Sequence, residues 1–159
     1  MRLTDEDYRD IQGLARFGYG HLGSARFHLL TLVDLAAARA WLSEVPVTTA
    51  VKGKRPDTAL NVAFSYEGLR KLGGRPDTLG QFPYEFKSGM TQPSRARRLG
   101  DVDASDPNKW QWGGPGNVPD VLVMLYAVTP QRLDEWEQQI SGKTWGPAFT
   151  RLACLTTSD

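Results

Sequence analysis

Residues 59–73 read ALNVAFSYEGLRKLG, and they decide the fold because their periodicity changes in the middle. Apolar side chains alternate with small or polar ones over residues 60–64, the pattern of a strand that buries one face. From Tyr66 the apolar residues recur every three positions, which indicates a short helix with Ser65 as its N-cap and Gly73 at its end. A strand that leads directly into a helix requires other strands beside it and a packed surface beneath it.

Five further segments have a clear periodicity. They predict strands over residues 25–33, 121–127 and 149–155, and helices that follow the N-cap residues Asp34 and Thr129. The continuously apolar run 121–127 is expected to be a central strand with a neighbour on each edge. The order strand, helix, strand, strand, helix, strand predicts an α+β fold. We expect a ferredoxin-like split βαβ arrangement, a four-stranded antiparallel sheet with its helices on one face.

The domain organisation is simple. Residues 1–9 are polar and predict a flexible N-terminal arm, and residues 10–159 predict a single ferredoxin-like domain. Proline and glycine punctuate residues 75–119, so this stretch has room only for short helical pieces. It is interpreted as a long insertion between the middle strands of the sequence.

The composition excludes several classes of partner. The chain has 159 residues, and its 19 Lys and Arg residues balance 18 Asp and Glu residues, for a net charge of +1. Such a balance produces no field that would attract nucleic acid or an anionic membrane, and neither partner is expected. The lone Cys154 excludes an internal disulfide and a cysteine-rich metal site. Together with the lack of a signal-peptide pattern or a long apolar run, it favours a cytoplasmic location.

Several segments, in order, resemble the dye-decolourising (DyP-type) haem peroxidases. They are the stretch 59–73, FPYEFKSGM at residues 82–90, RARRLGD at residues 95–101, and the glycine-rich residues 10–23 near the N-terminus. The resemblance implies the N-terminal ferredoxin-like half of an enzyme built from two such halves. It also implies that the distal acid, the distal arginine and the histidine that ligates haem iron come after the matched region.

The residues themselves offer little chemistry. Neither His21 nor His28 has a second ligand at a metal-binding spacing, and His28 is expected to be a satisfied strand residue. Residues 18–23 spell G-x-G-x-x-G, but they precede the first strand and do not link a strand to a helix. Residues 52–55 form a basic loop, for which a solvated connection is preferred over a phosphate cradle. We therefore expect no catalytic, cofactor-binding or metal-binding residue in this chain.

Two functions are compatible with these expectations. The first is the non-haem small subunit or N-terminal half of a split DyP-type peroxidase, which oxidises dyes and phenolic compounds with peroxide. It would not be catalytic alone, and haem b would be held by a partner chain in a hetero-oligomer. The second is a free-standing ferredoxin-like binding or interaction module; an engineered truncation would leave the fold prediction unchanged.

Aromatic residues outside the predicted strands are the candidates for a partner interface. Trp110, Trp112 and Trp145 lie in or near loops, where core or interface packing is preferred over an electron relay. Tyr84, Trp110 and Trp112 in the insertion are predicted to contribute to the contact, because aromatic anchors dominate such interfaces.

Overall fold

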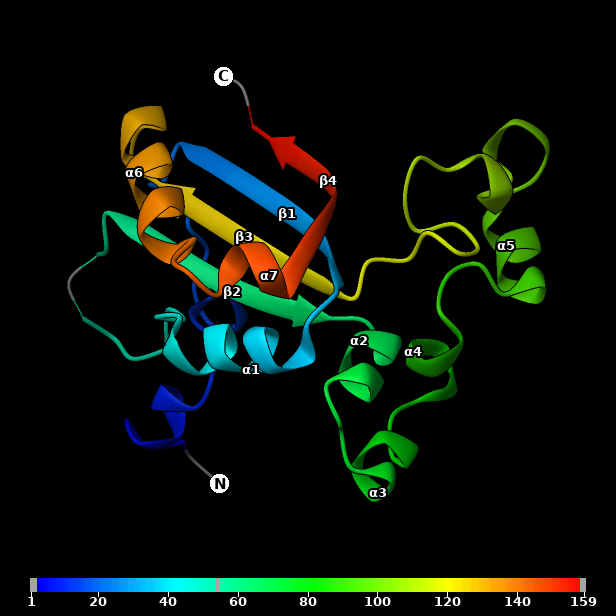
Figure 1. The fold of residues 1–159 in the computed structure, drawn as a ribbon, viewed down its shortest axis with the longest axis horizontal. Coiled ribbons are helices and arrows are strands. Elements are labelled where there is room, and N and C mark those ends of the chain that lie inside the picture. Colours follow the sequence, from blue (N-terminus) through cyan, green and yellow to red (C-terminus); the bar gives the residue numbers. More distant parts are fainter. Residues whose placement is uncertain (1–2, 54, 158–159) are drawn as a thin grey trace.

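A four-stranded antiparallel sheet with the strand order β2-β3-β1-β4 forms the centre of the structure, a computed structural model that describes residues 3–53 and 55–157 (Figure 1). Its strands are β1 (Ser24–Leu32), β2 (Thr58–Phe64), β3 (Val121–Ala127) and β4 (Phe149–Thr156). Helix α1 (Leu35–Glu44) follows β1, and α6 (Pro130–Ile140) follows β3. The predicted α+β, ferredoxin-like order is therefore confirmed.

Parts of three predicted segments lie outside the described residues. These are Met1 and Arg2 of the arm, Lys54 of the basic loop, and Ser158 and Asp159 at the end of the predicted domain. In the rest of the arm, Asp7–Arg9 form a turn of 3-10 helix, and the Tyr8 carbonyl accepts a hydrogen bond from the Ala50 N–H at 3.1 Å. That the arm is flexible stays a prediction.

Strand β3 is central, as predicted from its apolar sequence. It pairs with β1 from Val121 opposite Leu30 to Ala127 opposite Ser24, and with β2 along the same length. Both of its edges are hydrogen-bonded, and its side chains alternate between buried and half-buried, so only one of its two faces is fully covered.

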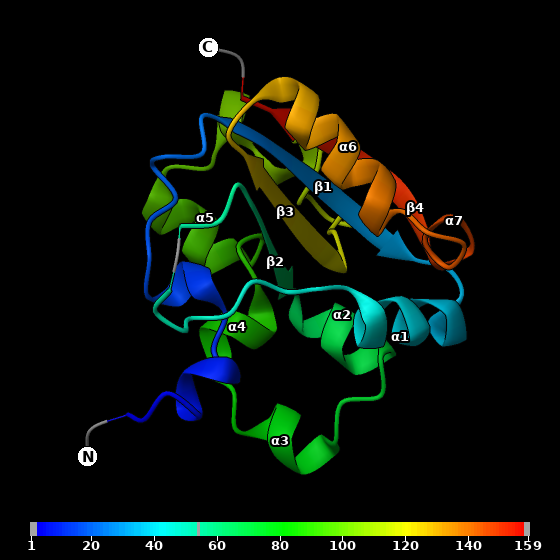
Figure 2. The same ribbon diagram turned by 90° about the vertical axis from the view of Figure 1, so that its left-hand side faces the viewer.

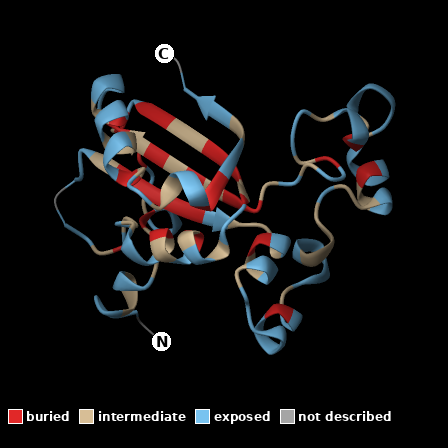
Figure 3. Ribbon diagram, viewed as in Figure 1, coloured by how far each residue is buried: buried red, intermediate tan, exposed pale blue. Residues whose placement is uncertain are grey.

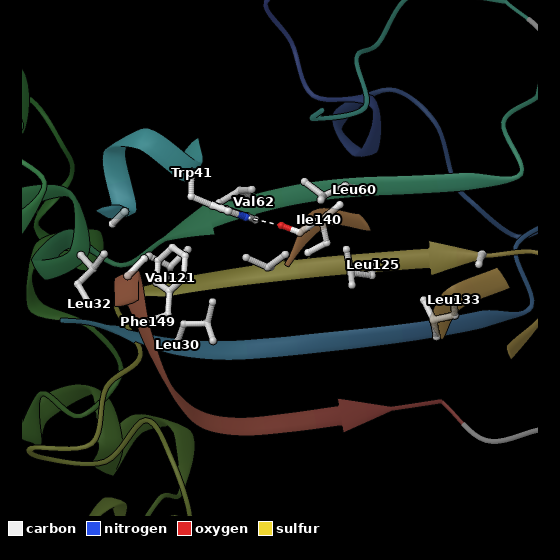
Figure 4. Packing of buried hydrophobic residues seen from close by; sticks show 14 residues of the cluster. Leu30, Leu32, Trp41, Leu60, Val62, Val121, Leu125, Leu133, Ile140 and Phe149 are labelled. Atoms are coloured by element: carbon white, nitrogen blue, oxygen red, sulfur yellow. Dashed lines mark hydrogen bonds between the residues drawn. The ribbon is translucent and has the colours of Figure 1, made fainter. Parts of the chain in front are cut away.

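Helices α1 and α6 cover one face of the sheet, together with the short helix α7 (Trp145–Ala148) (Figures 2 and 3). The Trp41 side chain of α1 reaches across the core, and its indole N–H donates to the Ile140 carbonyl at 2.7 Å (Figure 4). This bond joins the ends of two helices that are 99 residues apart in sequence. The core beneath them consists of buried side chains from every strand, among them Leu30, Leu60, Val62, Val121, Val123, Leu125 and Phe149.

The predicted helix caps are present. Asp34 accepts hydrogen bonds from the Ala36 and Ala37 N–H groups, and Thr129 accepts one from the Arg132 N–H. Ser65 caps α2 (Tyr66–Lys71), and Gly73 follows that helix with a φ of 83°, in the left-handed region. Local capping chemistry therefore fixes where these helices begin and end.

Two local expectations are corrected. Helix α7 was not predicted, because Gly146 and Pro147 obscure its single turn; its Trp145 ring packs 5.1 Å from that of Trp41 in the core. Strand β2 was expected to bury one face, but it also buries Asn61 on the other face, which is 1% exposed. The Gln12 side chain covers Asn61, donating to the Val62 carbonyl at 2.7 Å and accepting from the Val62 N–H at 2.8 Å.

The insertion between β2 and β3 consists of short helices, as predicted. After α2 come α3 (Pro76–Gly80), α4 (Tyr84–Ser88) and α5 (Pro93–Leu99), followed by single 3-10 turns at Asp103–Ser105 and Pro107–Lys109. Figure 1 shows this part extending away from the sheet, beyond the end of β2. No helix within residues 3–53 and 55–157 is long and apolar enough to cross a membrane.

Asp120 closes the insertion, and its side chain is 2% exposed. One carboxylate oxygen accepts a hydrogen bond from the Leu32 N–H at 2.9 Å, and Lys71 Nζ donates to both oxygens at 2.9 and 2.8 Å. The Asp120 N–H donates to the Leu30 carbonyl at 2.8 Å, and its carbonyl accepts from the Ser65 N–H at 3.1 Å. Asp120 thus ties β1, the end of β2 and α2 together.

Replacing Asp120 with Ala should lower the free energy of unfolding by about 3 kcal/mol, because the buried Leu32 N–H loses its acceptor and Lys71 loses its partner. Urea unfolding followed by tryptophan fluorescence measures this loss. The control is Asp77→Ala, which removes an exposed carboxylate on α3 and should change the stability by about 0.5 kcal/mol or less. Equal losses in the two variants would contradict the structural role of Asp120.

Candidate functional site

The insertion displays apolar side chains to solvent. Tyr84 on α4 is 63% exposed, and Trp112, which follows the last 3-10 turn, is 39% exposed. Other large apolar residues of the insertion are exposed as well: Phe86, Met90, Leu99, Val102 and Val118. Single exposed apolar residues are ordinary, and that these seven form one surface that binds a partner stays a prediction.

Trp110 differs from the other two predicted interface residues. Its side chain is half-buried, and its indole N–H donates to the Ser105 carbonyl at 2.8 Å. Gly114 packs against the Pro107 carbonyl, too closely for a Cβ atom at that position. Trp110 therefore holds its own loop in shape, while Tyr84 and Trp112 are available to a partner. Whether these residues form an interface stays a prediction.

A second apolar surface lies on the sheet face away from the helices, and its individual residues were not predicted from the sequence. The register places Phe27 of β1 beside Met124 of β3 and Leu155 of β4, and places Leu122 and Tyr126 on the same face. We call these five residues the open sheet face. Four of them are half-buried and Leu155 is 41% exposed.

Part of this face is already covered. The Tyr19 ring lies 5.0 Å from that of Tyr126, and Leu22 and Ala59 complete a small buried cluster with them. Burial raises the pKa of the Tyr126 phenol and of the Tyr19 phenol, so both remain neutral at physiological pH. The N-terminal segment therefore shields one end of the open sheet face, while Phe27, Leu122 and Met124 stay half-buried and Leu155 stays exposed.

His28 is a strand residue, as predicted, but it is not satisfied. Its side chain is fully buried between the sheet and α6, and Nε2 lies 3.0 Å from a carboxylate oxygen of Glu137. The two atoms are not aligned as a hydrogen bond, and neither ring nitrogen has a hydrogen-bond partner within the described residues. Glu137 is instead bonded to Arg26 and lies 3.4 Å from Arg151.

Neither histidine fits an iron ligand. His28 is enclosed, with Trp145 packed edge-on at 5.6 Å, and no cofactor could reach its ring without unpacking the core. His21 lies on the surface side of the N-terminal segment, where Nε2 is held 3.0 Å from the Pro56 carbonyl. In the part of the chain that the structure describes, no group of three or more His, Cys, Asp or Glu side chains could hold a metal ion.

Comparison with solved structures places this architecture among the DyP-type peroxidases. The structure matches the imidazole complex of AauDyP with a TM-score of 0.73 and 25% identity, over 94% of this chain and 33% of that one. It matches a DyP-type peroxidase of the fungus Auricularia auricula-judae with a TM-score of 0.75 and 23% identity, over 96% and 33%. A dye-decolourising peroxidase in complex with 2,6-dimethoxyphenol gives 0.69 and 24%, over 93% and 33%.

The chain thus spans about a third of the length of the solved structures it matches. Its predicted resemblance to one ferredoxin-like half of these enzymes is confirmed by the structure. No protein-family model matches the sequence, and no curated protein is similar enough to count as a relative.

The buried histidine should make the stability depend on pH. Burial lowers the pKa of His28, opposed by Glu137 and reinforced by the positive charges of Arg151 and Arg26. The unfolded chain therefore binds the proton more tightly. The stability contributed by neutral His28 is complete above its ordinary pKa of 6.5 and is lost as the pH falls through that value toward the folded pKa.

The thermal midpoint of the wild-type chain should therefore decrease as the pH is lowered from about 7.5 to 5.5. The decrease should be smaller in His28→Gln, because glutamine binds no proton in this range. Circular dichroism melts at several pH values measure the slope of the thermal midpoint against pH for both proteins. A His28→Gln slope equal to that of the wild type would contradict the assignment.

Proposed function

We propose, from the fold that this chain shares with one ferredoxin-like half of the DyP-type peroxidases, that it is the non-haem half of a split enzyme of this type. The other half, on a separate chain, would hold haem b and the catalytic groups. Together they would oxidise dyes and phenolic compounds with peroxide. The observation that carries the proposal is the match of nearly the whole chain to a third of each peroxidase.

The two apolar surfaces support an obligate partner. An extended insertion with exposed Tyr84 and Trp112, and a sheet face that carries Met124 and Leu155, are what a half-enzyme would bury on assembly. Permanent interfaces of this kind are larger and more apolar than transient ones. Tyr84 and Trp112 are the best candidates for anchors, since exposed aromatic rings contribute disproportionately to binding.

The surroundings of the two histidines decide which catalytic roles we assign to the partner chain. A haem peroxidase needs an axial ligand on iron and an acid–base group beside the peroxide. Because His28 is enclosed and His21 is bonded to the Pro56 carbonyl, these roles are assigned to the partner. This chain would shape and cover the assembly without touching the reacting atoms. A cytoplasmic assembly is proposed because the only thiol, Cys154, is free and exposed.

A free-standing binding module is the second candidate. The chain has its own core, in which Leu30, Leu60 and Leu125 are fully buried, so it does not need a partner to form the sheet. In this case the apolar surfaces would serve another protein or a second copy of the chain, and no haem protein would be involved.

Mixing the chain with the haem-bearing half of a DyP-type peroxidase from its own host distinguishes these functions. Size-exclusion chromatography with light scattering should give a one-to-one complex that carries the Soret absorbance. The chain alone should bind no stoichiometric haem and show no peroxidase turnover. A chain that elutes apart from the haem protein, with unchanged turnover in the mixture, would overturn the proposal and leave the free-standing module.

The double variant Tyr84→Ala/Trp112→Ala should weaken the complex at least about tenfold if both rings are anchors. The matched control is Val33→Ala/Leu14→Ala, which removes two exposed apolar side chains outside the insertion and should bind like the wild type. Equal weakening by both double variants would show that the insertion has no special part in the contact.

A further inference from the structure

A cavity of about 850 Å³ lies between the N-terminal segment and the basic loop. Residues 16–21 form one wall, and residues 48, 49, 51–53, 55 and 56 form the other. These two segments are some thirty residues apart in the sequence, and Figure 2 shows them along the same side of the molecule. Its volume is within the range of about 300–1,000 Å³ that small-molecule sites occupy.

The charges in this cavity have one sign. Arg16, Lys52 and Arg55 line it, and no Asp or Glu is among the described residues of its lining. The chain as a whole is nearly neutral, with a net charge of +1, so three cations without a carboxylate are a local concentration of charge. Positive groups gathered in a concave site focus the potential and attract anions.

Two of the polar side chains are held in place. Arg16 donates to the Ala50 carbonyl at 3.0 Å, and its guanidinium lies 3.7 Å from the centre of the Tyr8 ring. An arginine has five N–H donors, so a guanidinium fixed through one bond retains donors for a ligand. His21 donates from Nε2 to the Pro56 carbonyl, which fixes its ring against the opposite wall.

The lining also lets a ligand approach the backbone. A Cβ atom added at Gly18, Gly20 or Gly53 would meet nothing within 4 Å, so these three glycines leave open space at both walls of the cavity. Phe17 and Val51 supply apolar surface beside them.

We infer that this cavity binds a small organic anion, with a phosphate, sulfate or carboxylate group at the cations and an apolar body against Phe17 and Val51. The inference does not rest on the proposed function, because no residue of the cavity belongs to the open sheet face or to the insertion. The basic loop, interpreted from the sequence as a solvated connection, is on this view one wall of a binding site.

Phenyl phosphate is the probe, titrated into the full ¹⁵N-labelled chain at low salt. The amide signals of Gly18, Gly20 and Gly53 should shift saturably. Inorganic phosphate should bind more weakly because it lacks the apolar body, and benzyl alcohol should not bind because it lacks the charge. Benzoate tests whether a carboxylate serves as well as a phosphate.

Lys52→Gln/Arg55→Gln should raise the dissociation constant at least about fivefold, since two exposed cations near the anion are lost. The matched control Arg98→Gln/Lys143→Gln removes the same charge from exposed sites outside the cavity, and its dissociation constant should stay close to that of the wild type. Arg16→Gln provides an independent variant on the opposite wall, with the same expected weakening.

Three results would overturn the inference. They are shifts that do not saturate or that lie elsewhere, equal weakening by the control pair, and binding of benzyl alcohol as tight as that of phenyl phosphate. Equal weakening by the control pair would show that net charge alone accounts for binding, and tight binding of benzyl alcohol would show that apolar contact alone does.

Discussion

The buried carboxylate of Asp120, paired with the partly exposed Lys71, is the constraint on which the rest of the structure depends. It closes the whole segment between β2 and β3, residues 65–120, because Ser65 and Lys71 near the start of that segment both bond to Asp120 at its end. Gly68 of α2 packs directly against the Asp120 carbonyl, where a Cβ atom would overlap it. With its two ends joined, the insertion can extend from the sheet without separating β2 from β3.

The periodicity of the sequence was sufficient for the strands, the two main helices and their caps, because each depends on neighbouring residues. It was not sufficient for contacts across the chain. Lys71 and Asp120 are 49 residues apart, and nothing in either segment indicates that they pair. The burial of Asn61 depends on Gln12, which is equally remote. Helix α7 was missed because Gly146 and Pro147 are typical of loops.

The candidate surfaces were predictable to different degrees. Tyr84 and Trp112 lie in a stretch rich in proline and glycine, where exposure is expected, and the structure does leave them exposed. Trp110 could not be distinguished from them, since its bond to the Ser105 carbonyl is a property of the folded loop. The residues of the open sheet face could not be predicted because VLVMLYA is apolar at every position. Only the register shows that Val123 and Met124 lie on opposite faces of the sheet.

Hydroxyl-radical footprinting, read by mass spectrometry, tests most directly whether the chain is one half of a larger body. The chain is oxidised alone and together with the haem-bearing half of a DyP-type peroxidase from its host. Assembly should protect Met124 on the open sheet face and Tyr84 on the insertion, and should leave Trp136 of α6, on the helix side, unchanged. Oxidation of Met124 and Tyr84 at the same rate with and without the haem-bearing half would contradict the account.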